Sequence, residues 1–375
     1  MKKLSLLLLA LCSVVYGQSW TLLTNLPSTL VSNGGGAKIY GPGDGSLYSS
    51  VGIGTSPTEV NHIFVAAESC ITASPSTCWK DITTSTISGS GSEGQIQSIS
   101  LLSNNTVLAC ASNGSSTADC WTWNGNTSSP VWTIVGGWTG ASSSFIYGST
   151  NDAAGNNWFS PAYSGDLWKS AGTTPTYSKI LTSVYTVTGQ TPGGIYSLKN
   201  EVMNGVPDLC GGGEGELECF NLASLSTTPT WTSYLPNSGW TGNLFGCDSS
   251  ANTLICLRED SAGDFVNRIN KTTLATTTVT ANSAAPAYPN SNAVPTIHWL
   301  NGLNWAMGNK SSSVNWVALS ADDGVTFTAA PAGYCPGGTL SFPSTSTVRI
   351  AATSNYVYIP CTISGNAAIS QYGPL

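Results

Sequence analysis

The chain has 375 residues, its formal net charge is −7, and only 8% of its residues are charged, against about 25% in ordinary domains. This acidic, weakly charged composition disfavours nucleic acid and anionic lipid as partners. The length exceeds that of a usual single domain, although a closed repeat fold can use it as one unit.

Residues 1–17 have the three parts of a secretory signal. Lys2 and Lys3 supply positive charge, residues 4–15 are apolar, and Val15-Tyr16-Gly17 forms a cleavage site. An apolar stretch of about twelve residues is too short to span a bilayer. We therefore predict a signal peptide at 1–17 and a single mature domain at 18–375, which is secreted and has no membrane span.

The mature sequence consists of short β-rich runs separated by turn residues, without helical periodicity. One stretch shows the pattern as four successive strands: Gln95–Leu102, Thr106–Ala111, Cys120–Trp123 and Val131–Val135. Similar quartets are predicted at 194–234, 242–269 and 296–329. Each quartet is expected to form a four-stranded antiparallel sheet.

Six loops rich in Ser, Thr, Gly and Pro run into an aromatic residue that opens a strand. They are Thr72–Trp79, Gly125–Trp132, Ser170–Tyr177, Ser224–Trp231, Arg258–Phe265 and Ser320–Phe327. Their aromatics lie 53, 45, 54, 34 and 62 residues apart, a loose period near the size of a four-stranded unit. Self-similarity on this scale predicts a β-propeller.

The seventh unit lacks such a loop, and its missing strand lies at the other end of the chain. Residues 347–352 and 356–363 supply strands after Phe327, whereas Ser19–Leu23 is similar to the strand that follows each loop. We predict that the N-terminal strand completes the C-terminal sheet, which removes exposed sheet edges. The expected fold is an all-β, single seven-bladed β-propeller, with six or eight blades as alternatives.

Ten cysteines remain after the signal, an even number on an oxidising route. Eight lie in close pairs, which adjacent strands of a hairpin would bring side by side, although sequence alone leaves the connectivity open. The expected disulfides are Cys70–Cys78, Cys110–Cys120, Cys210–Cys219, Cys247–Cys256 and Cys335–Cys361. A metal site is disfavoured because there is no CxxC motif and His62 and His298 are the only histidines. We predict no metal and no cofactor.

Five Asn-x-Ser/Thr sequons are candidate glycosylation sites. They are Asn104, Asn113, Asn126, Asn270 and Asn309. We expect some of them to carry glycans, which would help to solvate a surface poor in charge.

The last loop, Ser320-Ala-Asp322-Asp-Gly324-Val-Thr326-Phe327, resembles the Asp-box of BNR-repeat, sialidase-like β-propellers. The other five loops are degenerate versions of it. In that family the box is a structural hairpin turn in which Asp accepts backbone N–H bonds, Gly permits positive φ and the aromatic packs between blades. The resemblance therefore implies a structural role for these residues and not a catalytic one.

The chemistry of sialidases is not expected here. Those enzymes use three converging arginines, and this chain has just three, Arg258, Arg268 and Arg349. The first two lie in one predicted blade, with Arg268 on its outer strand, so they cannot readily meet Arg349 over a central funnel. The family's early F/Y-R-x-P motif is also missing.

A glycoside hydrolase or lyase acting on neutral polysaccharide is the alternative function. It would need two carboxylates on the funnel face. Glu93, Asp166 and Asp208 lie near predicted strand ends and are candidates, but no spacing singles out a pair, and the catalytic residues stay unassigned.

Two further features have both a functional and a structural interpretation. The carboxylates Glu214, Glu216 and Glu218 alternate, which would suit Ca²⁺ or, as we favour, a solvated hairpin edge. Several tryptophans outside the loops could stack on sugars, although structural packing is the better interpretation. They are Trp138, Trp158, Trp240, Trp299 and Trp305.

Together these observations favour a non-catalytic, monomeric extracellular module that binds a glycan or an extracellular glycoprotein. A purely structural coat or wall component is a third alternative. The functional part of this prediction rests on analogy between folds.

Overall fold

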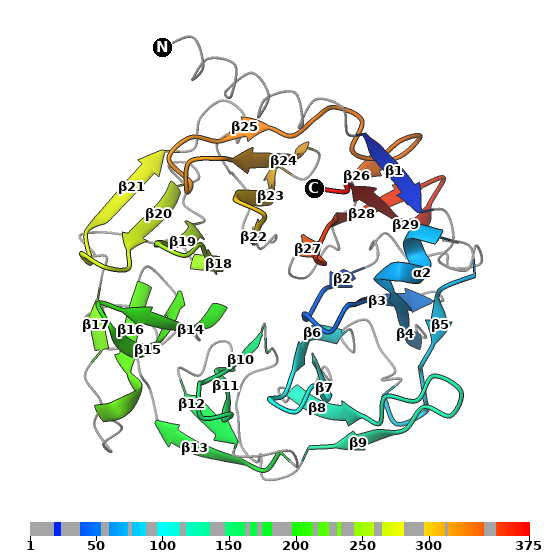
Figure 1. Cartoon of the computed structure of the whole chain (residues 1–375). Coiled ribbons are helices and arrows are strands. Elements are labelled where there is room, and N and C mark those ends of the chain that lie inside the picture. Colours follow the sequence, from blue (N-terminus) through cyan, green and yellow to red (C-terminus); the bar gives the residue numbers. More distant parts are fainter. Residues whose placement is uncertain are drawn as a thin grey trace.

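The computed structural model describes most of the mature domain. The described residues are 19–23, 38–53, 60–73, 77–87, 96–112, 118–135, 146, 148–161, 166–170, 175–181, 197–212, 217–224, 231–233, 244–258, 265–280, 296–311, 314–340 and 350–375. The predicted signal peptide lies outside them. Seven antiparallel sheets form a ring around a central axis (Figure 1), which confirms the predicted seven-bladed β-propeller.

Six blades each contain four strands that are consecutive in the chain. Blade 1 contains β2 (Lys38–Tyr40), β3 (Ser46–Ile53), β4 (Val60–Ala67) and β5 (Lys80–Asp81). Blade 2 contains β6 (Ile96–Leu101), β7 (Val107–Ser112), β8 (Ala118–Trp123) and β9 (Trp132–Ile134). Blade 3 contains β10 (Ser149–Asn151), β11 (Asn157–Phe159), β12 (Leu167–Ser170) and β13 (Tyr177–Leu181).

The next three blades repeat this order. Blade 4 contains β14 (Ser197–Met203), β15 (Val206–Gly212), β16 (Leu217–Asn221) and β17 (Trp231–Ser233). Blade 5 contains β18 (Leu244–Ser249), β19 (Thr253–Arg258), β20 (Phe265–Asn270) and β21 (Thr276–Thr280). Blade 6 contains β22 (Thr296–Leu300), β23 (Leu303–Ser311), β24 (Val314–Ser320) and β25 (Thr328–Ala329). A short helix, α2 (Glu68–Ala73), and a 3₁₀ turn, η1 (Leu222–Ser224), are the helical elements of the described residues.

The seventh or closing blade joins the two ends of the chain. It contains β1 (Trp20–Leu23), β26 (Thr339–Leu340), β27 (Ala351–Ala352), β28 (Val357–Ile363) and β29 (Asn366–Tyr372). β1 pairs with β29 so that Trp20 lies opposite Tyr372, while β26 and β27 both pair with the other edge of β28. The predicted closure is confirmed, although β29 was not foreseen as a strand.

One strand of each blade faces the axis of the ring: the first strand in blades 1–6 and β27 in the closing blade. β2, β6, β10, β14, β18, β22 and β27 contact one another in that circular order, and β27 returns to β2, as Figure 1 shows. These seven strands therefore form the wall of the central channel, and any side chain that they turn inward faces it.

The hydrophobic core is divided into layers between blades. One layer joins blades 1 and 2 through Tyr48, Trp121, Trp123 and Trp132. Because neighbouring blades cover both faces of a sheet, strands such as β28 are buried along most of their length, and their sequences are apolar runs without alternation.

The five disulfides join the cysteine pairs expected from the sequence. In three of them the cysteines lie directly opposite each other on adjacent strands: Cys110–Cys120, Cys210–Cys219 and Cys247–Cys256. Cys70 instead lies in α2, and Cys335 lies in the loop that follows β25. A loop of about ten residues closed in this way contributes roughly 2–3 kcal/mol in the loop-entropy model.

One of the six predicted loops was placed wrongly, and a second begins inside a helix. Phe265 opens β20, the third strand of blade 5, and the fourth strand is β21, so the predicted quartet 242–269 ended too early. Arg268 accordingly lies on the third strand. In blade 1, Thr72 belongs to α2, which replaces part of the expected turn. With β21 as the fourth strand, the outer strands of blades 1–6 begin 52, 45, 54, 45 and 52 residues apart, a more regular period than the aromatics gave.

The turn at residues 320–327 has the hydrogen bonds that an Asp-centred hairpin requires. Asp322 accepts bonds from the Thr326 backbone N–H at 2.8 Å and hydroxyl at 2.6 Å, and the N–H of Gly324 donates to Ser320 Oγ at 2.8 Å. Gly324 has φ of 77°, and Phe327 is buried in the layer between blades 5 and 6. The turn thus locks two blades together.

We expect Asp322→Ala to lower the free energy of unfolding by about 1 kcal/mol at pH 6, a modest effect because the side chain is exposed. Burial alone would raise the pKa of Asp322, but hydrogen bonds from Thr326 and Ser320 outweigh it and lower the pKa from 3.8. A carboxyl with a lowered pKa stabilises the fold above its unfolded pKa, and this contribution is lost as pH falls through the folded value.

Denaturant unfolding at pH 6 and pH 3 checks this expectation. The difference between wild type and Asp322→Ala should shrink in acid, whereas Val325→Ala, an exposed change in the same turn, should have little effect at either pH. A difference that stayed constant with pH would contradict the role given to the ionised carboxylate.

Candidate functional site

The central channel holds a cavity of about 490 Å³ that residues on or beside all seven inner strands line. Its size is typical of sites for small ligands, which range over about 300–1,000 Å³. Hydroxyl and amide side chains provide much of its wall: Ser98, Ser100, Ser103, Asn105, Ser149, Thr150, Asn151 and Ser197. Lys199 and His298 are the described lining residues with basic side chains.

Polar side chains of the inner strands also tie the blades together. Ser100 Oγ and Ser149 Oγ are 2.5 Å apart between blades 2 and 3, and Asn151 Nδ2 donates to the Leu101 carbonyl at 2.8 Å. Between blades 4 and 5, the N–H of Cys247 donates to Ser197 Oγ at 3.0 Å. The polar wall is therefore held in place by bonds between neighbouring blades.

Blade 1 meets the closing blade by close backbone contact. A Cβ atom added to Gly41, which follows β2, would lie 2.3 Å from the carbonyl oxygen of Ala352 on β27. Real side chains do not tolerate that distance, so only glycine fits here.

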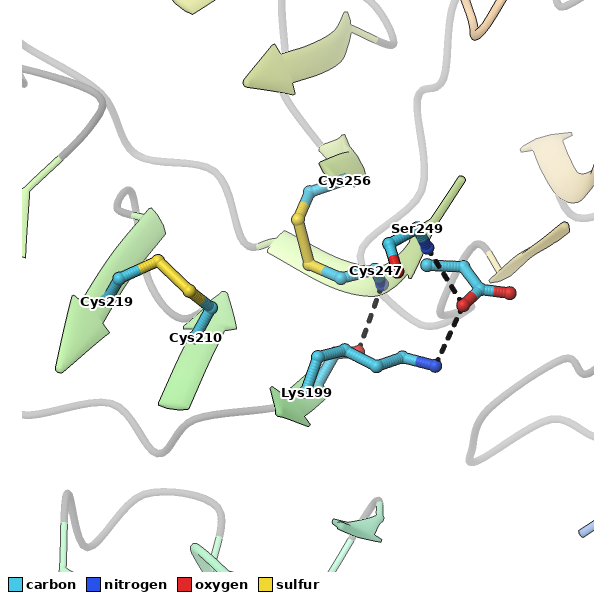
Figure 2. Close-up of a disulfide and its surroundings, with 8 residues drawn as sticks. Lys199, Cys210, Cys219, Cys247, Ser249 and Cys256 are labelled. Atoms are coloured by element: carbon cyan, nitrogen blue, oxygen red, sulfur yellow. Dashed lines mark hydrogen bonds and ion pairs between the residues drawn. A yellow bond between two sulfur atoms is a disulfide. The ribbon is translucent and has the colours of Figure 1, made fainter. Parts of the chain in front are cut away.

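Two side chains from neighbouring inner strands meet at the carboxylate of Asp248, which lies on the inner strand β18 between them. Lys199 of β14 places Nζ 3.0 Å from Asp248 Oδ1, and His298 of β22 places Nδ1 2.8 Å from Asp248 Oδ2. Backbone N–H groups of Ser249 and Trp299 also donate to this carboxylate, at 2.9 and 2.8 Å. Figure 2 shows Lys199 reaching across from its strand beside the Cys247–Cys256 disulfide. We call Lys199, Asp248 and His298 the channel triad.

Asp248 is the buried centre of the triad. Burial alone would raise its pKa, but Lys199, His298 and the Trp299 N–H outweigh that effect and hold the pKa well below its usual range. The carboxyl is therefore ionised, whereas the side chains of Lys199 and His298 are each about one-third exposed. The triad presents a cation and an imidazole to the cavity and keeps its anion behind them.

The sequence reasoning missed this triad. Its three members are separated by 49 and 50 residues, which is close to the spacing of the blades. Charged or titratable residues that recur at this spacing were the sequence signal that could have revealed the triad. His298 was considered only as a weak metal candidate, and groups of three or more potential metal ligands are absent from the described residues.

Two of the three candidate carboxylates are described, and neither lines the cavity. Glu93 lies outside the described residues. Asp166 pairs with Lys179 of the outer strand β13 at 2.9 Å, and Asp208 is buried on the second strand, β15, where burial raises its pKa. No carboxylate is among the described residues that line the cavity, since Asp248 lies behind Lys199 and His298, so no carboxylate pair suited to glycoside hydrolysis is found in the described part of the wall.

The arginines that sialidase chemistry would need are not assembled in the described structure. Arg268 donates through Nε to the Asp323 carbonyl and through Nη1 to Thr277 Oγ1, so it links blades 5 and 6. Arg349 lies outside the described residues, and the side chain of Arg258 is not described.

The remaining candidates have mixed outcomes. Trp158 and Trp305 are fully buried, which confirms their structural role, and Trp299 is partly exposed. Glu218 is buried, contrary to the solvated hairpin edge that we favoured, because β16 lies inside its sheet. The other residues, Trp138, Trp240, Glu214 and Glu216, lie outside the described residues.

Three sequons are described with their side chains, and all three are exposed at turns. Asn104, Asn126 and Asn270 each use Oδ1 to accept backbone N–H bonds of the next residues. Asn113 lies outside the described residues, and the side chain of Asn309 is not described. Glycosylation of these sites stays a prediction. Among the described residues no helix is long and apolar enough to cross a membrane.

The fold defines the chain as a β-propeller with a polar central cavity, and the comparisons with known proteins agree with this class. No protein-family model and no curated protein matches the sequence.

Solved structures share the fold at very low identity. YCF48 bound to D1 peptide is 7% identical, with 94% of this chain and 96% of that chain covered and a TM-score of 0.57. The AfRom2 CNH domain is 10% identical, with 94% and 98% covered and a TM-score of 0.54. The outer coat vertex of COPII on membranes is 10% identical, with 91% and 84% covered and a TM-score of 0.56. At such identity the likeness shows the fold alone.

Proposed function

We propose that this chain is a secreted, disulfide-stabilised β-propeller that binds glycans in its central cavity without chemically changing them. The observation that carries the proposal is the wall of the cavity, where hydroxyl and amide groups from several blades converge with Lys199 and His298. Sugars are recognised through many hydrogen bonds, and a rigid ring of inner strands holds such groups at fixed positions.

Secretion is supported by two independent features. The first 17 residues have the pattern of a signal peptide, and all ten cysteines of the mature domain form disulfides in the structure, which is typical of an oxidising compartment. We propose 18–375 as the mature, monomeric domain, with glycans on exposed sequons and a structural, Asp-box-type turn at 320–327.

Binding is favoured over hydrolysis by the electrostatics of the channel. A glycosidase needs two carboxylates about 5–10 Å apart, one of them protonated. Asp248 is ionised and is occupied by four donors, so it can serve neither as a general acid nor as a nucleophile.

A binding screen run beside a hydrolysis screen tests the proposal. Neutral and acidic oligosaccharides from plant, algal and bacterial polysaccharides would be offered to the full mature domain, with binding and product release both recorded. We expect retention of at least one glycan and no product. Retention should fall at least tenfold in Thr150→Trp, which fills part of the cavity.

The matched control is Thr133→Trp, which places the same side chain on the exposed outer strand β9. It should leave glycan retention unchanged. If neither substitution changed glycan retention, the glycan would have to bind outside the cavity. Turnover that disappears when one carboxylate is replaced would instead establish a hydrolase or lyase.

A further inference from the structure

The channel triad fixes which nitrogen of His298 carries the hydrogen when the imidazole is neutral. Asp248 is ionised, so its oxygens can only accept hydrogen bonds. Nδ1 of His298 lies 2.8 Å from Asp248 Oδ2, and that contact therefore requires a hydrogen on Nδ1. In the neutral imidazole the second nitrogen, Nε2, is then an acceptor.

Lys199 has the opposite character. Its ammonium group has three N–H donors and no acceptor, and the described structure uses one contact, to Asp248 Oδ1 at 3.0 Å. The Nε2 atom of His298 has no partner among the described residues. A donor and an acceptor, both anchored to the same carboxylate, thus line one part of the cavity wall.

We propose that Lys199 and His298 form a subsite for two neighbouring hydroxyl groups of a neutral sugar ring. One hydroxyl donates to His298 Nε2, and the adjacent hydroxyl accepts a bond from Lys199 Nζ. This inference rests on the proposed function and narrows it to uncharged saccharides.

The same chemistry disfavours an acidic sugar. The negative charge of Asp248 offsets the positive charge of Lys199, so the subsite has little net charge to attract a carboxylate. The lone pair of Nε2 would also face the oxygens of such a group and repel them. A hydroxyl group avoids this conflict because it can both donate and accept.

The inner strands beside His298 bring no described titratable side chain to the subsite other than the members of the triad. β14 supplies Lys199 and β18 supplies Asp248, while β27, which also contacts β22, consists of Ala351 and Ala352. The other described charge on these strands, Glu201 of β14, is buried and paired with Lys271 Nζ at 2.7 Å, so it does not alter the argument.

Two substitutions remove the proposed contacts to the sugar while keeping Asp248 hydrogen-bonded. His298→Asn keeps an amide donor where Nδ1 contacts Asp248 and removes Nε2. Lys199→Met keeps the length of the side chain and removes the ammonium, while His298 and two backbone N–H groups still hold Asp248. Lys80→Met, an exposed change on the outer strand β5, is the control.

The experiment measures dissociation constants by calorimetry for cellohexaose, xylohexaose, mannohexaose and laminarihexaose, and for trigalacturonate as the acidic probe. We expect a neutral oligosaccharide to bind, about tenfold more weakly to Lys199→Met and about fivefold more weakly to His298→Asn, with no change for Lys80→Met. Deoxygenation of one ring hydroxyl should weaken binding to wild type and have less effect in the variant that lacks its partner.

The remaining outcomes distinguish failure of the hydroxyl subsite from failure of the proposed function. The hydroxyl subsite would be refuted if a neutral oligosaccharide bound equally well to wild type, Lys199→Met and His298→Asn. It would also be refuted if trigalacturonate bound more tightly than the neutral oligosaccharides and lost affinity in Lys199→Met. Either result would leave glycan binding in place. If none of these saccharides nor any glycan of the wider screen were retained, the proposed function itself would be wrong, and the subsite with it.

Discussion

Replacement of Trp20 by alanine is expected to lower the free energy of unfolding by about 3–5 kcal/mol, the usual loss when a large buried aromatic is removed. Trp20 is 6% exposed. Its ring contacts Trp305, Tyr334 and Tyr372, and its indole N–H donates to the Pro331 carbonyl at 3.0 Å. The side chain therefore joins the N-terminal strand to blade 6 and to the rest of the closing blade.

Chemical denaturation followed by tryptophan fluorescence and circular dichroism would measure this loss. Thr21→Ala is the matched control because Thr21 is the next residue of β1 and is exposed, so its substitution should change stability by less than about 0.5 kcal/mol. Trp20→Phe should give an intermediate result, since it keeps most of the packing and loses the hydrogen bond. Equal stability of Trp20→Ala and Thr21→Ala would show that β1 does not close the ring.

Gly41→Ala is expected to destabilise the protein by about 3 kcal/mol or more, the upper range for overpacking. The new Cβ would lie 2.3 Å from the Ala352 carbonyl oxygen. That oxygen belongs to the backbone of an inner strand, so relief requires β2 and β27 to separate at the junction of blade 1 with the closing blade.

Gly148→Ala provides the comparison. Gly148 also lines the cavity beside an inner strand, but a Cβ there meets nothing within 4 Å. Its substitution should be neutral, or stabilising by about 0.4–1 kcal/mol through the unfolded state. Thermal unfolding of the two variants side by side checks the prediction, and a similar midpoint for both would argue against close packing of β2 on β27.

The ring and its closure could be predicted because each blade repeats a local pattern. Trp20 begins a strand like those that open with Trp132 and Trp231, and the paired cysteines mark adjacent segments. The error in blade 5 arose because the aromatic residues were used to locate the fourth strand of each blade. Phe265 opens a third strand, since an aromatic fits any position that faces the layer between blades.

The channel triad could not be derived in the same way. Lys199, Asp248 and His298 lie in three blades, and each was one of many polar residues in a β-rich sequence. Their mutual distances follow from the tilt and register of inner strands that contact one another only across blades. The helix α2 was missed for a related reason: six residues are too few to show a helical period, and a disulfide from Cys70 to Cys78 holds them.

The pairing of β1 with β29 also determines when the molecule can finish folding. Ser370 Oγ donates to the carbonyl of Thr21, 349 positions away, whereas blades 1–6 pair strands that are near neighbours in the chain. Contacts of such long range form slowly because a large loop must close first. Because β1 is synthesised long before β29, it stays unpaired until β29 has been made, and Trp20 lacks its partners in the closing blade throughout that interval.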